Sequence, residues 1–162
     1  MLDEVSIRAA SFNALFENII FLSSLFSLCT AQVLKGVLYV FRGRRKKTRE
    51  LFEIVTWSTG GMPSSHAAVV CSLCTSIAFA EGIASNLFVF SFWFALVVLR
   101  DAMGVRRSAG LLAKGLNNLG KQAAEKTEID FRPVKEIQGH TPLEVIVGGL
   151  LGVFIAAGLY LF

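Results

Sequence analysis

Two histidines of this 162-residue chain lie in segments that interrupt an otherwise apolar sequence. His66 ends the run Gly60-Gly61-Met62-Pro63-Ser64-Ser65-His66, and His140 lies in Gly139-His140-Thr141-Pro142-Leu143-Glu144. Glycines let a backbone present its amides, and proline with serine is typical of a helix start, where amides and the helix dipole bind anions. We therefore expect an anion site at this helix start, with His66 in the first turn beside the anion. The alternative is a loop followed by a serine cap, with His66 at the membrane interface.

The second histidine segment has two interpretations. Thr141 to Glu144 fits a capping box with proline at the first helical position, which explains Glu144 without any catalysis. That interpretation does not explain His140. A carboxylate one helical turn away would fix the tautomer of His140 and stabilise its charged form, as a histidine nucleophile requires.

Lys35 and Arg42 are a third candidate feature. Seven residues are close to two helical turns, so both side chains leave the same face about 10.5 Å apart along the axis and can converge on one anion. An ammonium in an apolar stretch is costly without a partner. The alternative is that both side chains extend to the membrane interface.

Together these features suit a pocket for phosphate and its transfer, because they supply histidines, a carboxylate, fixed cations and a helix N-terminus. The two histidines have no adjacent cluster of ligands, so the spacing of a zinc site is missing. Neither a metal nor a cofactor is expected.

The elements that carry these residues are predicted from the composition. The chain is 54% apolar and 17% charged, with a mean hydropathy of +0.60, which excludes both an ordinary soluble domain and disorder. Residues 18–34, 54–80, 82–99 and 145–162 contain no Asp, Glu, Lys or Arg, and each is near the length that spans a bilayer. We expect an all-α polytopic membrane helical bundle of about four transmembrane helices plus amphipathic surface helices, in a single domain over residues 1–162.

The basic residues predict the orientation in the membrane. If four spans alternate sides, 15 of the 16 basic residues fall on one face, which the positive-inside rule makes cytoplasmic. We expect an integral protein of the bacterial inner membrane with its site facing the cytoplasm. The basic run from Arg42 to Arg49 lies beside the membrane, so lipid headgroups are its expected partner and nucleic acid is not.

Two apolar stripes predict packing surfaces. Leu112, Leu116, Leu119 and Ala123 are spaced as on one face of an amphipathic helix at the membrane surface. Gly148, Gly152 and Ala156 are spaced by four, which lets helices approach closely, either in the core or in a homodimer.

The motifs resemble the divergent branch of the type 2 phosphatidic acid phosphatases, over about residues 30–152. The resemblance rests on Lys35-x6-Arg42, on the glycine-rich segment through His66, on Arg100-Asp101-Ala102-Met103-Gly104-Val105-Arg106-Arg107, and on Gly139 to Glu144 followed by Gly148. It implies a metal-independent mechanism in which His140 attacks phosphorus, Glu144 orients it and His66 protonates the leaving oxygen. It further implies that the phosphoryl oxygens are held by Lys35, Arg42, Ser64 and the amides near Ser65.

The chain departs from the main family at four positions. Gly43 replaces a proline, Ser65 a glycine, Glu144 an aspartate and Val134 an arginine. Arg106 and Arg107, at the end of the preceding span, are the candidates to substitute for that arginine.

The leading hypothesis is a membrane phosphatase that hydrolyses a lipid phosphate, as a phosphomonoester or a diphosphate, through a phosphohistidine at the cytoplasmic leaflet. A non-catalytic protein of the same fold that binds a lipid headgroup or a partner is the alternative. A small transporter or channel subunit would use Lys35 and Glu17 as polar groups within the membrane. Haloperoxidase chemistry is disfavoured by the membrane setting.

Overall fold

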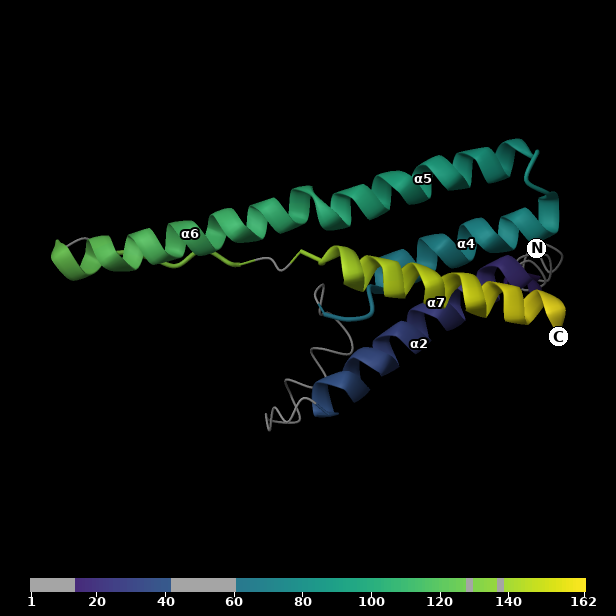
Figure 1. Cartoon of the computed structure of the whole chain (residues 1–162), viewed down its shortest axis with the longest axis horizontal. Helices are drawn as coiled ribbons and strands as arrows, with labels where there is room; N and C mark the ends of the chain where they lie inside the picture. The colour runs from purple at the N-terminus through teal and green to yellow at the C-terminus, as the bar shows by residue number, and fades with distance from the viewer. Residues whose placement is uncertain (1–13, 42–60, 128–129, 137–138) are drawn as a thin grey trace, which may run out of the picture.

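The protein is an all-helical bundle in the residues described by this computed structural model, which are 14–41, 61–127, 130–136 and 139–162. No strand occurs in this part of the chain. The helices are α2 (Ile19–Phe41), α4 (Ser65–Glu81), α5 (Asn86–Met103), α6 (Val105–Lys126) and α7 (Pro142–Leu161) (Figure 1). The expected helical fold class is confirmed.

Three helical stretches are long and apolar enough to cross a membrane. They are Ile19–Phe41, the run Asn86–Lys126 that comprises α5 and α6, and Pro142–Leu161. The apolar helix α4 has 17 residues, the lower end of the length that spans a bilayer. The protein is an integral membrane protein with three long apolar helices and one shorter one. Within the expected span 54–80, the helix begins at Ser65. Residues 54–60 of that span lie outside the described part.

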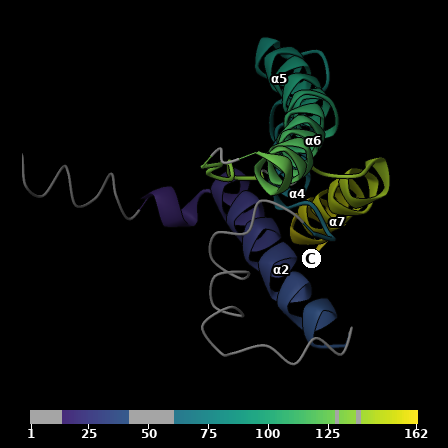
Figure 2. The same cartoon turned by 90° about the vertical axis from the view of Figure 1, so that its left-hand side faces the viewer.

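Helix α4 lies at the centre of the bundle and packs against α2, α5 and α7 (Figure 2). Its buried faces consist mainly of serine and alanine. Small residues let neighbouring helices approach closely in a membrane, where helix association depends on van der Waals packing and hydrogen bonds. The small side chains of α4 therefore explain why three helices can surround it.

The glycine stripe of α7 packs against α4 within the chain. A Cβ atom on Gly148 would collide with the backbone of Ser64, and one on Gly152 with the backbone of Ala68. Ala156, on the same stripe, is fully buried. Core packing is thus one role of this stripe, and the homodimer stays a prediction.

A buried polar seam joins α2 to α4. The hydroxyls of Ser23 and Ser76 are hydrogen bonded. Nearer the C-terminal end of α2, Lys35 Nζ donates to Ser65 Oγ at 3.1 Å. Between these bonds α2 contributes Ser27 and α4 contributes Ser72, both fully buried. The antiparallel helices are therefore joined by a hydrogen bond at each end of the seam, while the buried hydroxyls of Ser27 and Ser72 have no hydrogen-bond partner among the described residues.

Helix α6 continues the direction of α5 after a single non-helical residue, Gly104 (Figure 1). This confirms a helix where the leucine spacing predicted one, and Leu112, Leu116 and Leu119 are exposed on it. The helix extends away from the end of the bundle and does not lie across it. Its placement at a membrane surface stays a prediction.

Residues 130–136, here named the return segment, run back along α6 toward the bundle (Figure 1). The buried side chain of Asn117 holds them: its Nδ2 donates to Val134 O at 3.0 Å and to Glu136 Oε1 at 2.9 Å, and its Oδ1 accepts from Val134 N at 2.9 Å. The ring of Phe131 covers Gly120, where a Cβ would collide with it. The return segment thus leads the chain back to the start of α7.

The functional segments meet at one end of the bundle. The C-terminal ends of α2 and α5 and the N-terminal ends of α4 and α7 lie there, whereas the link 82–85 and Phe162 lie at the other end (Figure 1). This is the arrangement expected from helices that alternate in direction.

Candidate active site

The N-terminus of α4 is built by two serines. Ser64 is the cap, and its Oγ accepts from Ala67 N at 3.3 Å while its carbonyl accepts from Ala68 N at 3.0 Å. Ser64 and Ser65 are buried, and His66 in the first turn is partly exposed. The amides of Ser65 and His66 are the first-turn donors that Ser64 does not engage, so they are available to an anion.

His140 is anchored immediately before α7. Its amide donates to Ala102 O at 3.2 Å, and only 1% of its surface is exposed. The preceding residue, Gly139, lies against the backbone of Arg107, where a Cβ atom has no room. The backbone around His140 is therefore fixed by the end of α5 and the start of α6.

The two histidine rings face each other across the N-termini of α4 and α7. Their centroids are 6.1 Å apart and their planes are at 74°. Among the described residues, neither ring nitrogen of His140 has a hydrogen-bond partner, nor does Nδ1 of His66. Buried ring nitrogens are usually paired. Their unpaired state is what a site for a hydrogen-bonding or covalent ligand requires.

Glu144 makes the capping box expected from the sequence. Its Oε2 accepts from Thr141 N at 2.8 Å, and its amide donates to Thr141 Oγ1 at 3.4 Å. Since both His140 ring nitrogens are unpaired in the described part of the chain, no hydrogen bond from Glu144 orients them here. The orienting role of Glu144 therefore stays a prediction, and capping is its observed contact.

Burial is the main reason that the pKa of His140 lies below its ordinary value. The positive charge of Lys35 lowers this pKa further, with smaller effects of His66 and Arg106, while Glu144 opposes the shift. A lowered pKa keeps the imidazole neutral near pH 7, and a neutral ring has the lone pair that a nucleophile needs.

The candidate cations differ in where they lie. Lys35 is 3% exposed and donates to Ser65 Oγ, so its ammonium is at the N-terminus of α4. Arg106 and Arg107 are both exposed, and the charge of Arg106 reaches both histidines. No comparable interaction is described for Arg107, which makes Arg106 the better candidate. Arg42 lies outside the described residues.

Two departures from the main family have local explanations. The hydroxyl of Ser65, where the family has glycine, accepts the hydrogen bond from Lys35. Val134, where the family has arginine, is held through its backbone by Asn117 in the return segment. Among the described residues, the arginine whose charge acts on both histidines is Arg106 of α6. Asn117 was not among the residues singled out from the sequence, because an asparagine in an amphipathic helix is an ordinary surface residue.

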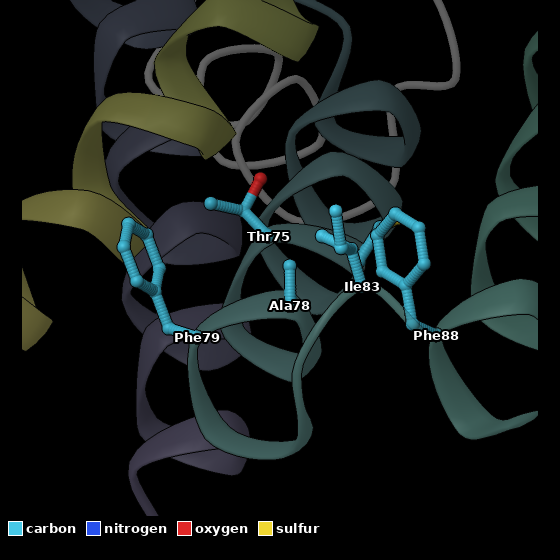
Figure 3. Close-up of a pocket in the computed structure, with 6 residues that line it drawn as sticks. Thr75, Ala78, Phe79, Ile83 and Phe88 are labelled. Atoms are coloured by element: carbon cyan, nitrogen blue, oxygen red, sulfur yellow. The ribbon is translucent and has the colours of Figure 1, made fainter. Parts of the chain in front are cut away.

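A pocket at the other end of the bundle is not this site. It is lined by side chains of α4, the link and α5, with Thr75, Ala78, Phe79, Ile83 and Phe88 around it (Figure 3). Its lining is mostly apolar, with Thr75 and Cys74 as its polar members. Such a lining suits hydrocarbon, and we assign no phosphate chemistry to it.

The order of the motifs and the facing histidines can be compared with known families. Residues 16–155 match the family model described as the divergent PAP2 family. The chain belongs to the divergent PAP2 family. It is also 39% identical over 154 residues to YuiD of Bacillus subtilis (strain 168), which is described as an uncharacterized membrane protein; the match covers 87% of this chain and 93% of YuiD. No solved structure matches the chain.

Membership in the divergent PAP2 family confirms the resemblance inferred from the motifs. The matched range contains Lys35, both histidines and Glu144, so the whole described site belongs to the family region. Neither the family description nor the relative's description states a substrate. The activity is therefore argued from the site.

Proposed function

We propose that this protein is a metal-independent membrane phosphatase that hydrolyses a lipid phosphate, either a phosphomonoester or a diphosphate, through a phosphohistidine. The observation that carries the proposal is the pair of neighbouring imidazoles at the N-terminus of α4, next to the buried ammonium of Lys35. Within the described part of the chain, both ring nitrogens of His140 and Nδ1 of His66 have no hydrogen-bond partner. A nucleophile, a proton donor and fixed positive charge are the groups that phosphoryl transfer needs.

In the proposed reaction a ring nitrogen of His140 attacks phosphorus with its lone pair. The bond between phosphorus and the leaving oxygen breaks, the electron pair stays on that oxygen, and His66 gives it a proton. Water then attacks the phosphohistidine and passes a proton to His66, while the electron pair of the phosphorus–nitrogen bond returns to His140. Both histidines end in their starting states, and inorganic phosphate is released.

The phosphoryl oxygens would be held by groups that already converge. Lys35 lies at the α4 N-terminus through its bond to Ser65, and the amides of Ser65 and His66 point out of the first turn. Arg106 would supply a second charge, and Ser64 shapes the turn. By resemblance, Arg42 would join them. Preorganised donors of this kind stabilise charge that develops in the transition state.

The site's position favours a lipid substrate of the cytoplasmic leaflet. It lies at the end of the bundle where α2 and α5 finish and α7 begins, and the basic residues of the sequence cluster in the connections at that end. The positive-inside rule places such connections in the cytoplasm. We therefore propose an inner-membrane protein whose site faces inward.

The test uses the purified protein in detergent with a panel of lipid phosphates and no added divalent metal. We expect phosphate release by the wild type, loss of release in His140→Ala, inhibition by vanadate, and a phosphorylated histidine that is trapped in the wild type only. Asn118→Ala, on the exposed face of α6, is the matched control and should keep full activity. Equal rates for the wild type and His140→Ala would refute the nucleophile assignment.

The second candidate is a non-catalytic protein that binds lipid headgroups. The near-complete burial of His140 favours it, because a nucleophile must reach phosphorus, and so does the use of the Glu144 carboxylate in the capping box. This function predicts that a lipid phosphate binds the protein at micromolar concentration without release of phosphate by any lipid of the panel. Binding that persists in His140→Ala would also support it.

A further inference from the structure

Helix α6 carries large apolar side chains that the rest of the described chain leaves uncovered. The helix projects from the bundle with the return segment along it (Figure 1). The side chains of Leu112, Leu116 and Leu119 are 73%, 52% and 67% exposed. The preceding helix, α5, has 18 residues and is already near the length that crosses a bilayer, so the 22 residues of α6 extend beyond the hydrocarbon. Exposed leucines in such a place indicate an interaction surface.

The spacing of the apolar residues on α6 is that of a coiled coil. Steps of four and three residues alternate along one stripe, here named the α6 stripe, which consists of Val105, Ala109, Leu112, Leu116, Leu119 and Ala123. All members of the stripe are exposed. Alternating steps of this kind are the a and d positions of the heptad repeat. A stripe restricted to these positions is typical of the contact between two helices, whereas a helix on a broad surface has a wider apolar face.

The residues beside the α6 stripe suit a second helix. In the heptad that the spacing defines, the flanking e and g positions are Arg106, Ser108, Ala113, Gly115, Gly120 and Gln122. Of these, Arg106 carries a charge, and its Nε is paired with Asp101 Oδ2 at 2.7 Å. Since e and g side chains meet across a coiled coil, two copies of α6 can approach each other without repulsion between like charges.

The cations of α6 are placed differently from those of a helix that binds lipid headgroups. Arg107, Lys114 and Lys121 are exposed at the f positions, on the face opposite the α6 stripe and across a helix about 10–12 Å wide. If the leucines entered a membrane surface, these cations would point away from the lipid phosphates, whose attraction for basic residues falls off within about 10 Å. In a coiled coil the same cations face water. Their placement therefore favours a second helix as the partner.

We infer that α6 pairs with α6 of a second copy of this chain through the α6 stripe, which makes the protein a homodimer. Both copies cross the membrane in the same direction, so their α6 helices run parallel, and a two-fold axis brings each stripe residue next to its own counterpart. The dimer leaves the glycine stripe of α7 in its place, because Gly148 and Gly152 pack against α4 within the chain. The inference concerns assembly and does not depend on the proposed function.

The first test is disulfide cross-linking in native membranes. The three native cysteines are replaced by alanine, and single cysteines are then introduced on α6. Leu112→Cys and Leu116→Cys should form disulfide-linked dimers on mild oxidation, because counterparts in the stripe lie within reach of each other. Leu111→Cys is the matched control, since Leu111 is a neighbouring leucine, 63% exposed, outside the stripe. It should cross-link at least about tenfold more slowly, because Cα atoms more than about 7 Å apart need backbone movement to be bridged.

The second test places a charge in the α6 stripe. Leu116→Glu would bring two carboxylates together in the dimer, so it should abolish the cross-linking of Leu112→Cys. Lys121→Glu makes a comparable change on the opposite face and should leave that cross-linking unchanged. If Leu116→Glu does not fold, the comparison of Leu111→Cys with Leu112→Cys decides, because both change one exposed leucine.

Two results would overturn the inference. Equal cross-linking rates for Leu111→Cys and Leu112→Cys would mean that copies collide at random. Absence of cross-linking at Leu112→Cys, together with quenching of a fluorescent label on Leu116→Cys by brominated lipid chains in vesicles, would make the membrane surface the partner of the stripe. Cross-linking needs no turnover, so a wild type that hydrolyses no lipid phosphate would refute the proposed function and leave this test intact.

Discussion

The carbonyl oxygen of Glu144 accepts a hydrogen bond of 3.0 Å from the amide of Ser64. This bond joins the first turn of α7, which follows His140, to the residue that caps α4 and precedes His66 by two positions. One turn further along α7, Gly148 packs against the same backbone. The spacing of the two imidazoles therefore depends on how closely α7 approaches α4.

Because α7 lies this close to α4, we expect Gly148→Ala to lower both the stability and the activity of the protein. The added methyl group would overlap the carbonyl of Ser64, so α7 must move away from α4. We expect a loss of about 1–3 kcal/mol of stability, as for other overpacked cores, with a loss of activity that exceeds the loss of folded protein. Thermal unfolding in detergent measures the first effect.

Gly158→Ala is the control for this change, since it lies on the same helix and a Cβ there meets nothing within 4 Å. It should be neutral or slightly stabilising, because alanine favours a helix more than glycine does. An unfolding temperature for Gly148→Ala equal to that of Gly158→Ala would contradict the packing argument.

Lys35→Met should separate binding from stability. Removing a buried ammonium can leave stability unchanged or raise it, because the cost of burying the charge disappears. Phosphate binding should weaken by a factor of about 10–100, the range for a lost hydrogen bond to a charged group. Vanadate or lipid phosphate titration of the folded variant checks this.

Lys121→Met, on the exposed face of α6, is the matched control and should keep its affinity. Equally weakened phosphate binding in both lysine variants would mean that binding depends on the net charge of this end of the bundle and not on the position of Lys35.

The lowered pKa of His140 predicts a pH dependence of stability. Burial and nearby cations hold this pKa below its ordinary value of about 6.5, so below that pH the unfolded chain binds a proton that folded His140 does not. Its stabilising contribution is full above about pH 6.5 and is lost as the pH falls through the folded pKa, with a slope of at most about 1.4 kcal/mol per pH unit.

Unfolding temperatures between pH 8 and pH 4.5 measure this dependence, over a range that brackets the ordinary histidine value of about 6.5. The curve for His140→Gln should be flatter than that of the wild type. Turnover by the wild type should fall over the same acidic range, because a protonated His140 lacks its lone pair. Parallel stability curves for the two proteins would be inconsistent with a buried neutral imidazole.

Asn117→Ala should release the return segment. The variant loses three hydrogen bonds to Val134 and Glu136, each of which contributes about 0.5–1.5 kcal/mol. His140 keeps its separate hydrogen bond to Ala102 O, so the arrangement of the two histidines should change less than the position of the return segment. Limited trypsin cleavage after Lys135 reports the release.

The neighbouring Asn118 is exposed, so Asn118→Ala gives a matched control for the loss of an asparagine from α6. It should leave the cleavage rate at Lys135 unchanged. Cleavage as slow in Asn117→Ala as in Asn118→Ala would show that the hydrogen bonds of Asn117 do not hold the return segment in place.

Much of the fold and the main histidine pair could be predicted from the sequence. Apolar runs predicted the helices because a bilayer requires internally bonded segments of fixed length. The motifs around His66 and His140 predicted a common face, because helices that alternate in direction bring such ends together. Glu144 was correctly predicted to fit a capping box, a contact that depends on local sequence alone.

The remaining features depend on tertiary contacts that spacing does not encode. The sequence left Arg106 and Arg107 equivalent, and the ion pair with Asp101 distinguishes them only once α6 continues α5 past Gly104. The role of Asn117 in holding the return segment can be recognised only from their hydrogen bonds in the structure. The start of α4 at Ser65 also depends on its Ser64 cap. The uncharged run that begins at residue 54 does not indicate where within it the helix starts.

The buried seam between α2 and α4 has a consequence for biogenesis. Alone in hydrocarbon, α2 would expose the hydroxyl of Ser23 and the ammonium of Lys35, whose partners Ser76 and Ser65 belong to a later segment of the nascent chain. Polar groups are costly there until they are satisfied. We therefore expect α2 to associate with α4 soon after α4 is synthesised, so that this pair of helices forms early during membrane insertion.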